Sequence, residues 1–194
     1  MIDGLLSLLS EITAVFDAHD VPWVLGGSLA SSHYGEPRTT TDADVAIVAR
    51  GEGLVSLIDD LRARFYVPDS ALSMIGLAGG SFNVVDSVRG VKADIFVLGD
   101  GVLDRKQISR RVQATIPGIA GDCWITAPED VVLRKLSWWR DTGGSDRQWR
   151  DLVEVLRSVG QRMDLEYLRA TAQEVGLEDE LARAVGEADD GLIG

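Results

Sequence analysis

The hydrophobic residues near the N-terminus follow first a helical and then a strand pattern. Apolar side chains at helical spacing predict an amphipathic helix over residues 2–18, through Leu5, Leu8, Leu9, Ile12, Val15 and Phe16. The short apolar run at 23–25 stops at two glycines and predicts a buried strand. Residues 28–34 predict a short helix, and Gly35 ends it.

The pattern then alternates between strands and helices before it becomes purely helical. Strands are predicted at 44–48, 82–85 and 92–98, and helices at 53–65 and 102–111. From Pro128 onward only helices are predicted, at 129–140, 146–158, 164–174 and 178–188. Thr126 and Glu129 have the spacing of a capping box for the first of these helices. The expected organisation is a mixed α/β core over residues 1–121 and a C-terminal helical domain over 122–194.

Composition places the chain among globular proteins with a sizeable core. It has 194 residues, of which 45% are hydrophobic. No run approaches the roughly 20 apolar residues of a membrane span, and no basic residue precedes the first apolar stretch. The single cysteine, Cys123, cannot form an internal disulfide and is expected to be buried. These features predict a cytoplasmic protein without membrane contact.

Charge is abundant, and it is unevenly distributed along the chain. The formal net charge is −12, which repels nucleic acid from most of the surface. Residues 105–150, however, hold nine basic and five acidic side chains. This net-positive segment could face a polyanion such as a triphosphate. Its alternative interpretation is a set of solvated helix faces, and spacing alone favours the alternative.

A glycine turn lies where the first predicted strand passes into a helix. Gly26, Gly27 and Ser28 occupy this junction. Glycines allow backbone N–H groups to approach phosphate oxygens, and a helix N-terminus favours an anion. Ser28 is therefore a candidate phosphate contact, with a helix N-cap as its alternative role.

Three aspartates are candidates for a magnesium site. Asp42 and Asp44 are two residues apart at the entrance of a predicted strand, so both point to the same face. Asp94 is a lone carboxylate inside an apolar strand, where burial is costly unless the charge is paired or bound to metal. Carboxylate oxygens are the ligands with which proteins hold Mg²⁺ beside substrate phosphates.

The combination of these residues resembles the DNA-polymerase-β-like nucleotidyltransferase superfamily. The Gly26-Gly27-Ser28 turn, the Asp42-Ala43-Asp44 strand and the later Asp94 follow its signature. The Arg38-Thr-x-x-Asp-x-Asp form resembles the bacterial branch that includes AbiEii-type toxins. A second block resembles the same branch, namely Ala127-Pro128-Glu129-Asp130 to Lys135-Leu136, followed by Arg147-Gln148-Trp149-Arg150-Asp151. The resemblance covers most of residues 22–156.

This resemblance implies a fold, a reaction and a set of residue roles. It implies a nucleotidyltransferase fold, a mixed sheet flanked by helices, with a C-terminal helical domain. The protein would transfer a nucleotidyl group from an NTP to a hydroxyl with the help of Mg²⁺. The acceptor is open between a tRNA, a protein and a small molecule, and a toxin–antitoxin partner protein is a further expectation. The implied roles are phosphate binding for Gly26, Gly27, Ser28 and Arg38, and metal binding and catalysis for Asp42, Asp44 and Asp94. Lys135 and Asp151 match positions that are often functional in toxin-like members, and the resemblance implies a catalytic role for both.

Each of these residues also has a simpler interpretation. Asp42 and Asp44 suit a turn and a strand end, and Asp94 suits a salt bridge to Lys92 or Arg89. Arg38 and Lys135 could be a loop cation and a surface lysine. Two other functions compete at the level of the whole chain. One is a non-catalytic binding module of a toxin–antitoxin or phage-defence system, and the other is a metal-dependent phosphohydrolase.

Overall fold

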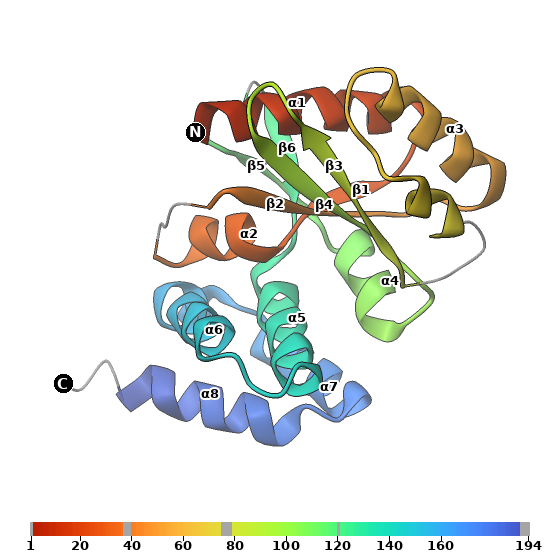
Figure 1. Ribbon diagram of the computed structural model, residues 1–194. Helices are drawn as coiled ribbons and strands as arrows, with labels where there is room; N and C mark the ends of the chain where they lie inside the picture. The colour runs from red at the N-terminus through yellow and green to blue at the C-terminus, as the bar shows by residue number, and fades with distance from the viewer. Residues whose placement is uncertain (1, 37–39, 75–78, 120, 191–194) are drawn as a thin grey trace.

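The protein was analysed as a computed structural model that describes residues 2–36, 40–74, 79–119 and 121–190. In these ranges the chain forms eight α-helices around one six-stranded sheet (Figure 1). The strands are β1 (Trp23–Leu25), β2 (Asp42–Ile47), β3 (Ser81–Asp86), β4 (Val91–Val97), β5 (Val112–Thr115) and β6 (Asp122–Ile125). The helices before β6 are α1 (Ile2–Ala18), α2 (Gly27–Tyr34), α3 (Gly51–Arg62) and α4 (Val102–Ser109). Those after it are α5 (Pro128–Asp141), α6 (Asp146–Val159), α7 (Leu165–Val175) and α8 (Glu178–Asp190).

The sheet is mixed, with the order β3-β4-β2-β1-β6-β5. The pairs β2–β4 and β1–β6 are parallel, and the other neighbours are antiparallel. Alternate residues of β2 and β4 point to opposite faces. The face formed by Ala43, Val45 and Ile47 and by Ala93, Ile95 and Val97 is buried. The helix α1 crosses this face, with α3 beside it (Figure 1).

The opposite face of the sheet carries the polar residues. Here Asp42 and Asp44 of β2 lie beside Lys92 and Asp94 of β4. The helix α2 packs on this side against β2, and the C-terminal helices α5 and α6 pack against α2 (Figure 1). The helical region therefore covers the same face of the sheet that presents the candidate carboxylates.

The C-terminal region is held by buried apolar faces of its helices. The helix α6 shows this clearly, because its buried side chains recur at helical spacing, namely Trp149, Leu152, Val153, Val155, Leu156 and Val159. These side chains belong to the same hydrophobic core as the sheet and α1. In the described residues, no helix has both the length and the apolar character that crossing a membrane requires.

The structure confirms the mixed sheet with flanking helices and the helical C-terminal region, and it adds two strands. The strands β5 and β6 have four residues each and were not predicted, because their patterns are too short to separate from loops. Residues 122–125 belong to the sheet, so the purely helical part begins at Pro128. The division of the chain into two domains at residues 121 and 122 stays a prediction.

The predicted capping box is wrong. The residue before α5 is Ala127, and no side chain caps the helix there. The Thr126 hydroxyl instead donates to the Leu25 carbonyl at 2.8 Å, and Glu129 accepts a hydrogen bond from Arg110 at 3.1 Å. Both residues thus connect elements of the fold, and α5 begins with Pro128 in its first turn.

Candidate functional site

Strand pairing brings two of the candidate carboxylates together. In the parallel pair β2–β4, Asp44 is the direct partner of Asp94, and Asp42 is the partner of Lys92. Neighbouring strands lie about 4.8 Å apart, and paired residues point to the same face. Asp42, two residues before Asp44, shares that face. The predicted placement of Asp42 and Asp44 on one face is therefore observed, and the register adds Asp94 to that face. The role of the three carboxylates as metal ligands stays a prediction.

The glycine turn is built directly against Asp44. The Gly26 N–H donates to the backbone carbonyl of Asp44 at 2.9 Å, and the Ser28 N–H donates to the Asp44 carboxylate. Gly27 has a φ of +50°, and a Cβ at this residue would lie 1.7 Å from Oδ2 of Asp44. Only glycine fits this position. The glycine turn and the Asp44 carboxylate are therefore in direct contact at the N-terminus of α2, and they belong to the same candidate site.

The alternative role of Ser28 as a helix cap is wrong. The capping residue of α2 is Gly26, which has an extended backbone and no side-chain hydrogen bond to the helix. Ser28 lies inside the first turn of α2. Its backbone N–H is one of those that a helix leaves without a partner of its own, and here Asp44 accepts it. Arg38, the fourth predicted phosphate contact, lies outside the described residues.

The electrostatics of Asp44 reflect this crowding. Burial raises the pKa of Asp44 above its ordinary value, and the negative charges of Asp94 and Asp42 raise it further. The N–H of Ser28 and the positive charge of Lys135 act in the opposite direction. The ionised form of Asp44 is thus destabilised by its neighbours, and a bound cation would relieve that cost.

Among the residues that the structure describes, Lys92 forms ion pairs with two of the carboxylates. Its Nζ is 2.9 and 2.8 Å from the two carboxylate oxygens of Asp94 and 3.8 Å from Oδ2 of Asp42. Asp42 also accepts a hydrogen bond from the Thr40 hydroxyl at 3.0 Å. The alternative interpretation of Asp94 as a salt-bridge partner is therefore correct for Lys92. It is wrong for Arg89, which pairs with Asp86 and Glu11.

The carboxylates fit a divalent cation by their chemistry. Among the residues that the structure describes, no three Asp, Glu, His or Cys side chains are already grouped tightly enough to hold a metal ion. Asp44, Asp94 and Asp42 nevertheless share one face of adjacent strands, and they offer the hard oxygen donors that Mg²⁺ prefers. Burial, together with repulsion by Asp94 and Asp42, raises the pKa of Asp44, and a bound cation would offset this cost of the ionised form.

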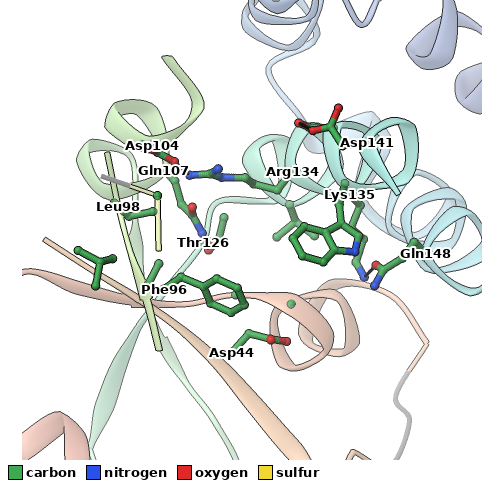
Figure 2. A pocket seen from close by; sticks show the side chains of 18 of the residues that line it. Asp44, Phe96, Leu98, Asp104, Gln107, Thr126, Arg134, Lys135, Asp141 and Gln148 are labelled. Carbon is green, nitrogen blue, oxygen red and sulfur yellow. Dashed lines mark hydrogen bonds and ion pairs between the residues drawn. The ribbon is translucent and has the colours of Figure 1, made fainter. Parts of the chain in front are cut away.

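A pocket of about 390 Å³ opens from Asp44 toward the helices (Figure 2). This volume lies in the range of small-molecule sites. One end is formed by the glycine turn and Asp44, and the sheet contributes an apolar side of Ala46, Phe96 and Leu98. The opposite side comes from α4, α5 and α6, through Asp104, Gln107, Arg134, Lys135, Trp138 and Gln148. The pocket thus joins the carboxylate side of the sheet to the basic segment of the chain.

Lys135 is the buried cation of this pocket. Its side chain is 6% exposed, and its Nζ lies 3.0 Å from Oδ2 of Asp151 and donates to the Gln148 amide oxygen at 2.8 Å. The interpretation of Lys135 as a surface lysine is therefore wrong. Asp151 itself does not line the pocket, so it positions Lys135 from behind. The two predicted residues come together across α5 and α6, and their part in a reaction stays a prediction.

Replacement of Lys135 should affect both stability and NTP binding. In Lys135→Met, Asp151 loses its buried partner, which should cost about 3 kcal/mol of unfolding free energy. If Lys135 binds a phosphate, as predicted, the loss of that charged hydrogen bond should also weaken NTP binding by about 1.5–3 kcal/mol. Thermal melts and calorimetric NTP titrations measure the two effects.

A second variant separates the two effects. Lys135→Met with Asp151→Leu removes both charges, so stability should recover while NTP affinity stays low. Lys106→Met is the control, because Lys106 forms an ion pair with Glu174 elsewhere on the molecule. If the double variant bound NTP as tightly as the unmodified protein, Lys135 would be only a structural cation.

Asp104, Gln107 and Arg134 are polar pocket residues to which the sequence analysis gave no role. Arg134 forms an ion pair with Asp104 of α4, and Gln107 donates from α4 to the Thr126 hydroxyl at 3.0 Å (Figure 2). These pairs join residues 19 to 30 positions apart. The only sequence signal was the position of Arg134 beside Lys135 in the net-positive segment.

Comparisons with known proteins identify the fold. No family model and no curated protein matches the chain. Among solved structures, an antigenic nucleotidyltransferase-like protein from Paracoccidioides brasiliensis matches with a TM-score of 0.55 and 16% identity, over 95% of this chain and 93% of that one. The solution structure of the antibiotic-resistance factor ANT(2'')-Ia matches with the same TM-score and identity, over 92% of this chain and 97% of that one. The crystal structure of ANT(2'')-Ia with adenylyl-2''-tobramycin matches with a TM-score of 0.55 and 16% identity, over 87% of this chain and 97% of that one. The chain therefore has the nucleotidyltransferase-like fold.

Proposed function

We propose that this protein is a Mg²⁺-dependent nucleotidyltransferase that transfers a nucleotidyl group from an NTP to a hydroxyl. The observation that carries the proposal is the setting of Asp44. It is in register with Asp94, touches the glycine turn at the start of α2, and borders a pocket that contains Lys135. Carboxylates, a glycine turn at a helix N-terminus and a buried cation are the groups that phosphoryl-transfer chemistry uses.

Each part has a role in the proposed reaction. Mg²⁺, held by Asp42, Asp44 and Asp94, would neutralise phosphate charge that develops during transfer. The turn at Gly26, Gly27 and Ser28 binds phosphate oxygens at the positive end of α2, with Arg38 as a further contact. Lys135 attracts the triphosphate from the other side of the pocket, and Asp151 fixes its position.

The chemical step joins the acceptor oxygen to the α-phosphorus. The acceptor hydroxyl attacks this atom, and the bond from the α-phosphorus to the bridging oxygen breaks, so that pyrophosphate leaves with the electron pair. The hydroxyl proton passes to the carboxylate of Asp94, which lies on the same face as Asp44 and helps to activate the attacking hydroxyl. Atoms and charge balance without a further reactant.

The acceptor is the open part of the proposal. One structurally similar protein, ANT(2'')-Ia, was crystallised with adenylyl-2''-tobramycin, a small molecule that carries a nucleotidyl group. A small acceptor is consistent with the net charge of −12, which disfavours a long nucleic-acid footprint. A tRNA or a protein hydroxyl remains the alternative, and labelling in a cell extract would identify the molecule that is modified.

One observation supports a second candidate function. Lys92 neutralises Asp94 in a two-oxygen ion pair, as in a structural rather than a catalytic arrangement. This favours the alternative of a non-catalytic binding module, for example in a toxin–antitoxin or phage-defence system with a partner protein. The toxin-type branch rests on the resemblance of the two blocks that contain Lys135 and Asp151, residues whose side chains form an ion pair.

NTP binding should depend on divalent metal if the proposed enzyme is correct. Calorimetric titrations with ATP, CTP, GTP and UTP, each with Mg²⁺ and with EDTA, measure this dependence. We expect at least one NTP to bind with Mg²⁺ and to lose most of its affinity in EDTA. Without a cation between them, the three carboxylates and the triphosphate repel each other. Equal affinity in both conditions would favour the non-catalytic module.

A further inference from the structure

Lys92 has a placement that the proposed reaction does not use. Its Nζ lies within 2.9 Å of both Asp94 oxygens and 3.8 Å from Asp42, its register partner, two positions before the Asp44–Asp94 pair on the same face. A single ammonium group thus contacts two of the three carboxylates that the proposed function assigns to the metal. Lys106, in contrast, pairs with Glu174, away from these carboxylates.

The position of this ammonium group conflicts with that of a metal ion. A carboxylate whose two oxygens both accept hydrogen bonds from an ammonium has to release it before these oxygens can bind a metal ion. A divalent ion beside a retained ammonium would also meet a like charge at close range, which is strongly unfavourable at a partly buried site. The Lys92 side chain is 41% exposed, so it has room to swing toward solvent.

We propose that Lys92 is a tethered counter-cation that competes with the metal ion for Asp94 and Asp42. This inference rests on the proposed function, because it takes the three aspartates as the metal site. Without metal, Lys92 offsets the repulsion among the carboxylates and keeps them on one face. When the ion enters, Lys92 leaves Asp94, and the free protein therefore binds metal weakly.

The competition also predicts that metal and NTP bind cooperatively. A triphosphate brings new negative charge into the site, so a displaced ammonium finds an anion near its former position. Metal and NTP should therefore bind more tightly together than either does alone. Lys92 would make the site selective for the metal–NTP pair over the free ion.

Metal titrations of the free protein test this inference. Calorimetry measures the binding of Mn²⁺ or Mg²⁺ alone to the unmodified protein and to Lys92→Met. We expect the dissociation constant for the ion to fall by about tenfold in Lys92→Met, because the competing charge is gone. Lys92→Arg keeps the charge and should not tighten binding. Lys106→Met is the matched control for the loss of one lysine and one ion pair.

Each result has a distinct meaning. Tighter binding in Lys92→Met, abolished when Asp44→Asn is added, would support the competition at the proposed site. An unchanged or weaker affinity in Lys92→Met relative to Lys106→Met would overturn the role of Lys92 and leave the proposed function standing. If neither the unmodified protein nor Lys92→Met bound the ion, with or without NTP, the metal site and this inference would fail together.

Discussion

Gly27→Ala is expected to abolish Mg²⁺–NTP binding and to destabilise the protein. Gly27 has a φ of +50°, which an alanine adopts only at a cost of about 1–3 kcal/mol. The added Cβ would also lie 1.7 Å from Oδ2 and 2.8 Å from Cβ of Asp44, so that this carboxylate has to move away from the turn. Since Asp44 joins the turn to the sheet, its displacement would separate phosphate binding from metal binding.

The neighbouring glycine provides a matched control. Gly26 has an extended backbone, and a Cβ there would meet Gln107 at 3.5 Å and Thr126 at 3.7 Å, which are ordinary contacts. Gly26→Ala should therefore cost no more than about 1 kcal/mol, as for alanine at a helix N-cap. Urea unfolding compares the stability of the two variants, and NTP calorimetry measures the loss of binding in Gly27→Ala. Gly27→Ala with unimpaired Mg²⁺–NTP binding would contradict the arrangement of the turn against Asp44.

Asp44→Asn is expected to abolish ligand-induced stabilisation while leaving the metal-free protein at least as stable as before. The pKa of Asp44 is raised above its ordinary value in the folded state by burial and by Asp94 and Asp42. A raised pKa favours the protonated form, so its stabilising contribution is present below the unfolded pKa and is lost as pH rises through the folded pKa. Above the folded pKa the ionised carboxylate is therefore a cost, and the neutral amide removes it.

Four thermal melts distinguish a metal ligand from a structural aspartate. Unmodified protein and Asp44→Asn are each melted in EDTA and in Mg²⁺–NTP, where bound ligand stabilises by mass action. Asp60→Asn is the control, because Asp60 is an exposed carboxylate that pairs with His19. A destabilised Asp44→Asn variant that still gained stability from Mg²⁺–NTP would remove Asp44 from the metal site.

Local sequence patterns were sufficient for most elements of this fold. The helix over residues 2–18 and the C-terminal helices follow from apolar spacing, because each buries one continuous face. The strands β5 and β6 could not be predicted, because four residues do not establish a period and their stability comes from neighbours in the sheet. The strand order and the parallel β2–β4 register depend on contacts between segments about 50 residues apart along the chain.

The candidate site divides in the same way between local and long-range features. The spacing of Asp42 and Asp44 and the apolar surroundings of Asp94 were visible in the sequence, and the structure places these residues on one face. The burial of Lys135 against Asp151 was not visible, because it requires two helices to pack. The contact between Gly27 and Asp44 likewise arises only when a turn and a distant strand meet.

The most direct test of nucleotidyl transfer follows the two ends of the triphosphate. The protein is incubated with Mg²⁺, a cell extract and each NTP carrying a radioactive label on either the α- or the γ-phosphate, with Asp44→Asn as the inactive control. The account predicts that α-label becomes attached to an acceptor while γ-label is released as pyrophosphate, only in the unmodified protein. Transfer of γ-label, release of free phosphate without a labelled acceptor, or equal labelling by Asp44→Asn would contradict it.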